Sequence, residues 1–296
     1  MTTMPFPTFL ILGAMRCGTS ALHSTLADHP QVFMSRKKEP NFFHDLHYRK
    51  SAFNDYQKVF DGWNGQQVVG ESSVLNLYYR FTAELIQKVL PNAQLIIVLR
   101  RPVDRAYSHY CYCVKKGHEW ETFPQAIRSE VAKKRLSHRF SSKGDWVFSY
   151  RSLSTYGPQL ARYFDRFHRE QILIISYESL IANPTCELRR IAEFLRIDPT
   201  VPLSLPMRTE PVANAGQWPR NRLLHRCAVR VAWESHAHWR LRSLARKALK
   251  TWPMETNLPS VPSEAVGMLE PWFEADLMWI RGLLGPQFTW PKKDPS

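Results

Sequence analysis

Short apolar runs alternate with amphipathic segments over the first two thirds of the chain. Continuous apolar runs of about four to eight residues are typical of parallel strands buried on both faces of a sheet. Apolar residues three and four positions apart are typical of helices that cover such a sheet. The predicted strands are residues 8–12, 67–69, 94–99 and 171–176, and the predicted helices are residues 19–28, 81–90, 104–116, 156–167 and 187–195. This alternation predicts an α/β fold with a central parallel β-sheet flanked by helices on both faces.

Polar residues at the ends of these runs predict where the elements begin. Thr19 or Ser20 is expected to cap the first helix, and Asp104 the helix after the third strand. Residues 70–73, Gly-Glu-Ser-Ser, are expected to form a turn after the second strand.

Three polar segments directly follow predicted strands. Residues 13–19 follow the first strand, residues 70–73 follow the second, and Arg100 follows the third. Ligands of parallel α/β sheets bind at the carboxyl ends of the strands. We therefore expect these three segments to converge on one rim of the sheet.

The last third of the chain has a different pattern, and its central region is strongly basic. The predicted elements are a loop at residues 207–219, a helical region at 220–250, a linker at 253–262 and an amphipathic helix at 263–284. The whole chain, residues 1–296, is expected to be a single domain. Its core would cover about residues 6–200, and a helical C-terminal extension about residues 201–296.

The charge narrows the class of ligand. The chain has 40 Lys and Arg against 26 Asp and Glu, a formal net charge of +14, which implies anionic partners. Nucleic acid, an acidic glycan, an anionic membrane surface and a nucleotide cofactor all fit this charge, and so does a basic surface that only confers solubility. The basic region at residues 220–250 fits an acidic glycan or a membrane as well as it fits a solvated helix face.

The cysteines and the hydropathy bear on location. Five cysteines without a CxxC pair are typical of a reduced, intracellular protein. No run approaches the roughly 18 to 20 apolar residues that span a bilayer. Residues 6–14 fit a buried strand better than a signal peptide. The expected location is cytoplasmic or membrane-peripheral.

The first rim segment has the layout of a phosphate-binding, P-loop-like turn. The apolar strand ends at Gly13, a second glycine follows at Gly18, and the hydroxyl residues Thr19 and Ser20 open a helix. The N–H groups at a helix N-terminus bind anions, and glycines allow close backbone approach. Thr19 replaces the Walker lysine, and the cation of the loop is Arg16, whose planar fork fits two phosphate or sulfate oxygens. The alternative is an ordinary strand-to-helix turn with chance glycines.

The segment Lys38-Glu39-Pro40-Asn41-Phe42-Phe43 places a carboxylate beside a cation. Near a transferring anion, Glu39 can accept a proton from an incoming hydroxyl or amine. Lys38 can offset the charge that develops on the bridging oxygen. The alternative is a solvated charged turn whose two phenylalanines pack in the core.

A second anion site is expected at the end of the third strand. Arg100 ends that strand, and Ser108 lies eight residues further on in the next helix. If both contact one anion, a ligand with two phosphate-like groups fits the rim. The alternative is that Asp104 and Arg105 form local ion pairs and Ser108 is exposed. No predicted strand ends in an acidic residue that would hold Mg²⁺, so no metal is expected.

These motifs, in this order and spacing, resemble the sulfotransferase family that uses 3′-phosphoadenosine 5′-phosphosulfate (PAPS). The resemblance is to the heparan-sulfate N- and 3-O-sulfotransferases and their bacterial relatives, and it runs from about residue 9 to residue 195. Residues 16–20 match the family's 5′-phosphosulfate loop, and residues 38–43 match its Lys-Glu-x-x-Phe-Phe segment. Arg100 and Ser108 match its 3′-phosphate motif.

The resemblance implies a role for each matching residue. Glu39 would be the general base, with Arg16 and Lys38 as further catalytic residues. The residues that bind PAPS would be Arg16, Cys17, Gly18, Thr19, Ser20, Ala21, Arg100, Ser108 and Arg220. The product would be the desulfonated nucleotide PAP. The acceptor would be a hydroxyl, with an amine as the weaker candidate, of a carbohydrate or glycolipid.

Two departures from the family pattern concern the acceptor. Many relatives have Glu-Lys-Thr-Pro where this chain has Glu71-Ser72-Ser73-Val74, so a lysine that would contact the sulfonate or the acceptor is absent. The heparan-type Lys-Gly-Arg loop near the C-terminus is also not evident. Residues 214–220 would close over the nucleotide instead.

Two other functions fit parts of the sequence. A P-loop nucleotide kinase or NTPase would need Mg²⁺ and a Lys-Ser/Thr pair, which the loop lacks. A nucleic-acid-binding protein without enzymatic activity fits the charge alone. The expected partners are PAPS, a carbohydrate or glycolipid acceptor and a peripheral membrane contact, and no nucleic acid.

Overall fold

The chain forms two compact units in the computed structural model. The described residues are 6–44, 50–136, 144–205, 218–219, 221–233, 239–250, 254–255, 260–285, 288 and 290. The first unit consists of residues 1–101, 156–210 and 276–296, and the second of residues 102–155 and 211–275. The single domain with a C-terminal extension stays a prediction.

Five strands form the sheet of the first unit. They are β1 (Phe9–Gly13), β2 (Val32–Met34), β3 (Val68–Ser72), β4 (Gln94–Leu99) and β5 (Ile172–Ser176). Their order is β2-β3-β1-β4-β5, and every neighbouring pair is parallel. The predicted parallel sheet is therefore confirmed, and β4 has the predicted bounds.

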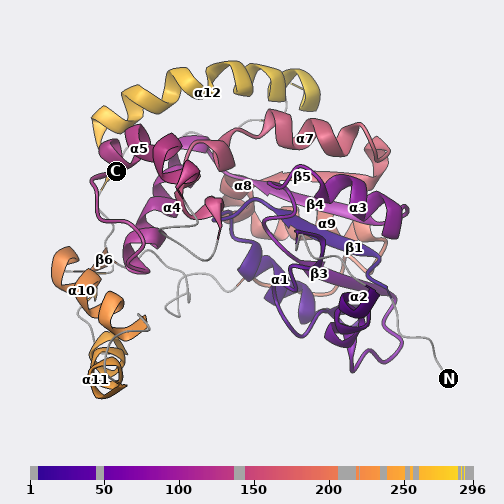
Figure 1. Cartoon of the computed structure of the whole chain (residues 1–296). Helices are drawn as coiled ribbons and strands as arrows, with labels where there is room; N and C mark the ends of the chain where they lie inside the picture. Colours follow the sequence, from indigo (N-terminus) through magenta and orange to yellow (C-terminus); the bar gives the residue numbers. More distant parts are fainter. Residues whose placement is uncertain are drawn as a thin grey trace. The chain divides into compact units, whose positions relative to one another are not determined.

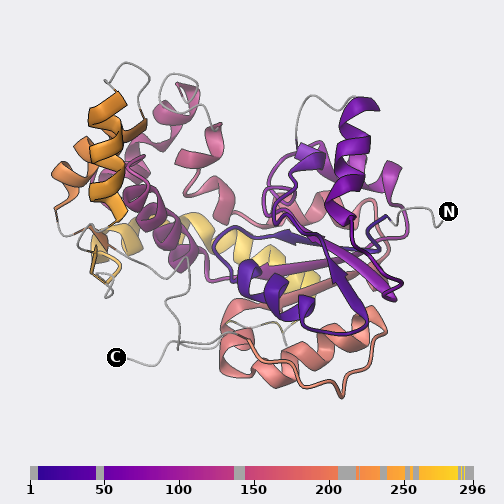
Figure 2. The same cartoon turned by 90° about the horizontal axis from the view of Figure 1, so that it is seen from below.

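Helices cover both faces of this sheet. They are α1 (Thr19–Ala27), α2 (Lys50–Gln57), α3 (Thr82–Val89), α7 (Gly157–Phe164), α8 (Tyr177–Ala182) and α9 (Pro184–Leu195), with short 3₁₀ turns η1 (Phe42–His44), η2 (Lys58–Phe60) and η5 (Arg169–Gln171). The crossovers through α1 and α3 run in opposite directions along the sheet, so right-handed connections place these helices on opposite faces. Figure 1 shows α3 and α7 on one side of the sheet and α1 on the other, and Figure 2 shows the sheet from the side of α1.

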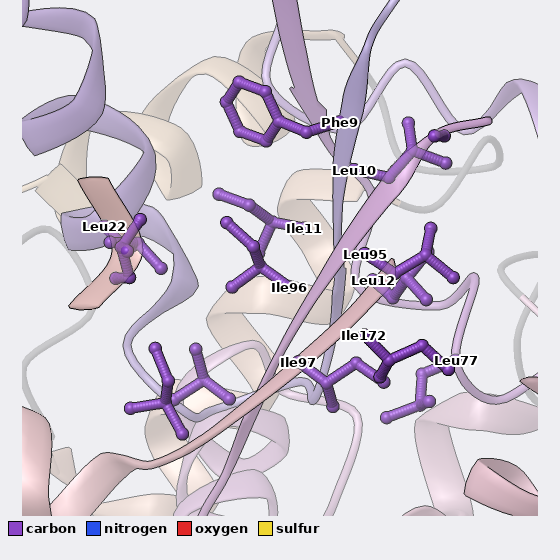
Figure 3. Close-up of a cluster of buried hydrophobic side chains, with 14 of the residues drawn as sticks. Phe9, Leu10, Ile11, Leu12, Leu22, Leu77, Leu95, Ile96, Ile97 and Ile172 are labelled. Carbon is purple, nitrogen blue, oxygen red and sulfur yellow. The ribbon is translucent and has the colours of Figure 1, made fainter. Parts of the chain in front are cut away.

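The core lies on both faces of β1 and β4. Ile11 and Ile96 point to the same side as Leu22 of α1, whereas Leu12 and Leu95 point to the opposite side (Figure 3). All five side chains are fully buried. Because successive side chains of a strand alternate between faces, both faces of these strands must be apolar, as the continuous apolar runs predict.

One strand, β2, was not predicted, and the second predicted strand, which is β3, is longer than expected. β2 has only three residues, too few for a periodic signal in the sequence. β3 continues through Glu71 and Ser72, so the predicted turn at residues 70–73 is wrong. The free-energy cost of burying the Glu71 carboxyl group in the strand is offset by hydrogen bonds from side chains that follow it in the sequence. Gly70 is required for packing, because a Cβ there would lie 2.2 Å from the ring of Phe9.

Two predicted helix caps are also wrong. The N-cap of α1 is Gly18, with φ 79°, and not Thr19 or Ser20. A left-handed residue is needed where the chain turns from β1 into α1, and glycine adopts that conformation without strain. Helix α4 (Pro102–Lys115) begins at its proline, as is common for the first helical position, so Asp104 lies within the first turn.

The second unit is mostly helical. Besides α4 it contains α5 (Phe123–Arg135), η3 (Asp145–Phe148), η4 (Ser152–Ser154), α10 (Arg222–Trp233), α11 (Trp239–Lys250) and the antiparallel pair β6 (Trp218–Pro219) and β7 (Met254–Glu255). Lys133 Nζ lies 2.8 Å from Glu119 Oε1 and 2.8 Å from Glu121 Oε2. Tyr150 donates a hydrogen bond to Glu119 Oε2 at 2.9 Å. These partners compensate the buried charges.

Helix α12 (Ser263–Leu284) has the predicted bounds. Its predicted apolar side is buried at Leu269, Phe273 and Ile280. In the first unit, Asp276 accepts hydrogen bonds from the N–H groups of Tyr156 and Gly157, each at 2.7 Å, and so satisfies N–H groups at the start of α7. Among the described helices, none is long and apolar enough to cross a membrane.

Candidate functional site

The loop between β1 and α1 has the geometry of an anion-binding turn. Gly18, the N-cap residue of α1, has no side chain that could accept a hydrogen bond, and the first turn of α1 contains no acidic residue. The first N–H groups of α1 and the positive end of its dipole therefore face the loop without a capping side chain from the helix itself. Ala14 N–H donates to Val98 O at 2.7 Å, which ties the loop to β4. Residues 14–18 thus leave the sheet at the carboxyl end of β1, as predicted.

The ring of Tyr177 packs against this loop. A Cβ at position 18 would lie 3.0 Å from Tyr177 Cε2, so only glycine fits there without a shift. The Arg100 guanidinium lies 4.8 Å from the centroid of the same ring, and its Nη1 donates to Arg16 O at 3.4 Å. The predicted convergence of the ends of β1 and β4 is therefore present. Tyr177 was missed by the sequence analysis, although it directly follows the last predicted strand.

Lys38 and Glu39 lie at the carboxyl end of β3, the neighbour of β1. Glu39 N–H donates to Ser72 O at 2.9 Å, and Lys38 Nζ lies 3.0 Å from Glu39 Oε1. The Lys38 and Glu39 side chains are 24% and 36% exposed, so solvent or a substrate can reach the carboxylate. This backbone hydrogen bond to β3 holds the Lys38–Glu39 segment next to β1, the strand that leads into the loop.

Strained backbone is concentrated at this rim. The non-glycine residues with positive φ in the described ranges are Arg16, Glu39, Asn41 and Arg196. The first three belong to the loop and to the Glu39 segment. A left-handed non-glycine residue costs on the order of 1 kcal/mol, and such strain is concentrated at functional sites. Two of the three residues predicted to take part in catalysis, Arg16 and Glu39, are thus held in unfavourable conformations by their surroundings.

A second carboxyl group, Glu71, lies buried behind this segment. Burial raises the pKa of Glu71 to about 7, against hydrogen bonds and the Lys38 charge that lower it, and the Glu39 charge raises it further. Its side chain accepts hydrogen bonds from Ser73 Oγ at 2.9 Å and from Asn76 Nδ2 at 3.4 Å. The sequence analysis missed Glu71 because it assigned residues 70–73 to a turn. Its position at the end of a strand was the available signal.

The partners of Glu71 connect it to the Glu39 segment. Ser73 Oγ accepts a hydrogen bond from Asn41 N–H at 3.2 Å. Asn76 Oδ1 lies 3.3 Å from His44 Nδ1. One buried carboxyl therefore orients two side chains, which in turn hold Asn41 within the Lys-Glu-x-x-Phe-Phe motif and His44 directly after it.

Several buried polar atoms around these residues have no hydrogen-bond partner in the described part of the chain. They are His23 Nδ1, Asn41 Oδ1, Tyr56 OH and Ser72 Oγ. Burial and the charge of Lys38 lower the pKa of His23 to about 4, so its ring is neutral at pH 7. Unpaired buried polar groups cost free energy unless water or a ligand satisfies them. The site therefore has unused hydrogen-bonding capacity.

Two predicted site residues, Ser108 and Arg220, are not placed with the residues described above. Ser108 is buried in α4, within the second unit. Its pairing with Arg100 stays a prediction. Arg220 and residues 214–217 lie outside the described residues. Within the described ranges, no group of three or more His, Cys, Asp or Glu side chains is placed to hold a metal ion.

Glu71→Gln is expected to remove a pH dependence of stability. In the wild type, the unfolded chain releases this proton near pH 4.5, whereas the folded protein keeps it up to about pH 7. The folded state binds more protons in this window, so stability falls as pH rises through it, by about 3 kcal/mol in total. Denaturant unfolding at pH 5 and pH 8 should show the variant gaining about this much, relative to wild type, at the higher pH.

The control for this experiment is Glu193→Gln, at an exposed position of α9. It should leave the difference between the two pH values as in the wild type. If Glu71→Gln showed the same pH dependence as the wild type, then Glu71 would not be the group that keeps its proton up to about pH 7.

Comparisons with known proteins show which proteins the chain resembles. The family model described as sulfotransferase domain matches residues 6–214. A solved structure, a sulfotransferase from Alicyclobacillus acidocaldarius, superposes with a TM-score of 0.60 at 32% sequence identity. The match covers 70% of this chain and 87% of that one.

Curated relatives are similar over the same part of the chain. The human bifunctional heparan sulfate N-deacetylase/N-sulfotransferase 2 is 29% identical over 205 residues, 65% of this chain and 22% of that protein. The mouse heparan sulfate glucosamine 3-O-sulfotransferase 3B1 is 28% identical over 191 residues, 64% of this chain and 46% of that protein. The chain therefore spans less than half the length of these two relatives.

Proposed function

Since the chain belongs to the sulfotransferase family, we propose that it transfers the sulfonate group of PAPS to a hydroxyl group of a carbohydrate or glycolipid. One observation carries this proposal. An uncapped helix N-terminus follows β1, and Glu39 is held at the end of the adjacent strand β3. An anion site and a base on neighbouring strands suit in-line transfer to an incoming hydroxyl. An amine acceptor is the weaker candidate.

The residues of the loop fit the 5′-phosphosulfate of PAPS. The first turn of α1 offers backbone N–H groups without a side-chain acceptor, and Gly18 leaves room that a Cβ would fill against Tyr177. Arg16 adds a planar fork for a pair of sulfonate or phosphate oxygens. The proposed binding residues of the loop are Arg16, Cys17, Gly18, Thr19, Ser20 and Ala21. Arg100, Ser108 and Arg220 are proposed to bind the rest of the nucleotide.

Each proposed catalytic residue has one task. PAPS supplies an activated sulfonate, whose charge spreads over its equatorial oxygens during in-line transfer. Arg16 donates hydrogen bonds to these oxygens and to the leaving phosphate. Glu39 accepts the proton of the acceptor hydroxyl. Lys38, 3.0 Å from Glu39, orients that carboxylate and offsets charge on the bridging oxygen. A monoanionic sulfonate needs less neutralisation than a γ-phosphate, so this chemistry calls for no metal ion.

Two observations support a hydroxyl-rich acceptor. The human and mouse relatives are named for heparan sulfate, a carbohydrate. On this chain, the residues next to Glu39 that are partly exposed include Lys38, Asn41 and His44, which can hydrogen-bond a sugar. Many relatives have a lysine at the position of Ser72, and the Oγ of Ser72 has no hydrogen-bond partner among the described residues.

The cytoplasmic or membrane-peripheral location and the peripheral membrane contact remain proposals.

PAP, the desulfonated product, is expected to stabilise the protein without added metal. At about 100 times its Kd, a ligand that binds only the folded state adds about 2.7 kcal/mol. For a chain of this size that raises the Tm by about 5–10 °C. Thermal unfolding with PAP, with ATP–Mg²⁺ and without ligand measures the difference. Transfer of radiolabelled sulfonate from PAPS to a panel of sugars then identifies the acceptor.

Thermal unfolding and oligonucleotide binding distinguish the proposed function from the two other functions that fit parts of the sequence. Stabilisation by ATP–Mg²⁺ but not by PAP would favour a nucleotide kinase or NTPase and contradict the proposal. A nucleic-acid-binding protein would instead bind oligonucleotides with an affinity that falls steeply with salt and does not depend on Arg16.

A further inference from the structure

Helices α10 and α11 of the second unit form a helical hairpin, which we call the basic hairpin. The two helices pack against each other (Figures 1 and 2). The strand β6, shortly before α10, pairs with β7, shortly after α11, and this pairing closes the hairpin at its base. None of the residues of the two helices is part of the proposed active site. A partner that binds to the hairpin is therefore bound outside that site.

The basic hairpin carries positive charge without acidic residues of its own. Helix α10 contains three arginines, and α11 contains three arginines and two lysines, whereas neither helix contains Asp or Glu. Glu234, between the helices, is the single acidic residue from residue 220 to residue 250. Within this stretch it offsets at most one of the charges, whichever arginine it pairs with. A negatively charged surface is therefore the complementary partner.

Helix α10 is fixed to the second unit along one side. His225 and Ala232 are buried, and a Cβ at Gly117, which follows α4, would lie 2.6 Å from Val229 Cγ1. Leu224 is instead 60% exposed. The side of α10 that packs on the unit is thus already defined by other residues, and this leucine lies outside it.

The exposed side of α11 has an apolar stripe with cations beside it. Leu241 and Leu244 are 55% and 62% exposed, and Ala248 is exposed as well. Residues three and four positions apart lie on one face of a helix, so these three form a single stripe. Arg240 and Lys247, both exposed, lie next to it. Helix α11 therefore turns an apolar stripe and a basic edge outward.

Exposed leucines are concentrated on the basic hairpin. In the described part of the chain, the leucines with more than half of their surface exposed are Leu224, Leu241 and Leu244. A solvated helix face gains nothing from such side chains, and a nucleic acid or an acidic glycan is held mainly by cations. An anionic membrane surface uses both features, because its lipid phosphates attract Lys and Arg while the acyl boundary buries apolar side chains. The combination therefore favours a membrane over a soluble polyanion.

We propose that the basic hairpin docks this protein on the surface of a membrane that contains anionic lipids. Helix α11 lies in the plane of the interface, where Leu241 and Leu244 are buried at the boundary between headgroups and acyl chains. Arg240 and Lys247 face the lipid phosphates. The helix has 12 residues, fewer than the roughly 20 that span a bilayer, so it lies on the membrane and does not cross it. The docking surface is independent of the proposed function, because it shares no residue with the proposed active site.

The test is flotation of the full chain with lipid vesicles at about 0.1 M salt. One set of vesicles is phosphatidylcholine alone, and the other contains about one part phosphatidylglycerol to three parts phosphatidylcholine. We expect binding to the anionic vesicles to be at least about tenfold tighter than to the neutral ones. The double variant Leu241→Gln with Leu244→Gln should weaken it by at least about tenfold, because two apolar side chains are no longer buried. Lys247→Glu should weaken it by at least about fivefold.

Two controls match these changes at positions outside the basic hairpin. Met278→Gln replaces an apolar side chain of α12 that is 60% exposed. Arg189→Glu, at an exposed position of α9, changes the net charge as Lys247→Glu does. Both controls should bind the anionic vesicles as the wild type does. Glutamine is a good helix former, and the substituted positions are exposed, so all variants should unfold at the same temperature as the wild type.

Three results would overturn the docking surface. The double leucine variant could bind anionic vesicles as the wild type does, which would mean that the cations alone attract any polyanion. Arg189→Glu could weaken binding as much as Lys247→Glu, which would assign the attraction to the net charge of the whole chain. The wild type could bind no vesicles and form a dimer that the double leucine variant dissociates, which would assign the apolar stripe to a second copy.

Vesicle binding needs no turnover, so it separates the docking surface from the proposed function. A protein that floats with anionic vesicles but is not stabilised by PAP would contradict the proposed function and leave the docking surface standing. Loss of vesicle binding in the double leucine variant should leave its stabilisation by PAP and its sulfonate transfer to a soluble sugar unchanged.

Discussion

Replacing Arg16 by alanine is expected to lower kcat by about 10²- to 10³-fold, the loss found when one donor to a developing negative charge is removed. Arg16 lies in the loop at the N-terminus of α1 and is partly exposed. Its side chain is the cation of the proposed phosphosulfate loop, because the Walker lysine is Thr19 here. Sulfonate transfer measured at saturating PAPS and acceptor should show the loss in kcat, and PAP affinity should fall as well.

The backbone of Arg16 offers a matched control. Its φ of 72° is unfavourable for alanine and free of strain for glycine. Arg16→Gly should therefore be more stable than Arg16→Ala, while both lose the same rate. If activity followed stability instead, with Arg16→Gly near wild type, then the side chain would serve the loop conformation and not the reaction. Arg189→Ala, an exposed arginine of α9, should keep full activity.

Glu39→Gln is expected to lower kcat by about 10²- to 10⁴-fold, the usual contribution of a general base. Glutamine keeps the shape of the side chain and the backbone bond to Ser72 O, but it cannot accept the proton of an acceptor hydroxyl. Sulfonate transfer measured at saturating PAPS and acceptor should show the loss in kcat.

The controls for Glu39 separate a base from a structural contact. Glu39→Asp retains a carboxylate at a greater distance and should recover part of the rate. PAP should stabilise wild type and Glu39→Gln equally, because the base does not bind the nucleotide. Full activity of Glu39→Gln at saturating acceptor would show that another group, or solvent, takes the proton.

The strain at Arg16 and Glu39 bears on both experiments. Each residue has a positive φ, and each is held there by contacts that come from other strands. Arg100 Nη1 donates to Arg16 O, and Ser72 O accepts from Glu39 N–H. Sequence propensity alone would not place an arginine or a glutamate in this conformation. The surrounding sheet therefore sets the positions of the two groups before a substrate binds.

Most of the fold could be predicted from the apolar runs. β1, β4, β5 and the long helix α12 lie where the pattern places them, since strands buried on both faces leave an unmistakable apolar run. The family match confirms the prediction of a sulfotransferase enzyme. β2 was missed because three residues carry no periodicity, and the end of β3 was missed because it is polar.

Polar residues inside strands explain why part of the site was not predicted. Glu71 resembles a turn residue in the sequence, and it becomes a strand residue only because Ser73 and Asn76 satisfy its carboxyl group. Likewise, the glycine at position 18 was read as a loop residue. Its additional role follows from Tyr177, which lies more than 150 residues away in the sequence and 3.0 Å from a Cβ at that position.

By itself, the sequence determined the α/β class, the loop after the first strand and the Lys38–Glu39 motif. These depend on local patterns, which is why they can be read along the chain. Only the tertiary structure decided which residues face one another. It placed Glu71 behind Glu39, raised the pKa of Glu71 by burial, and set Tyr177 between Gly18 and Arg100. Burial and the approach of distant segments govern these features, and neither is a property of any short stretch of sequence.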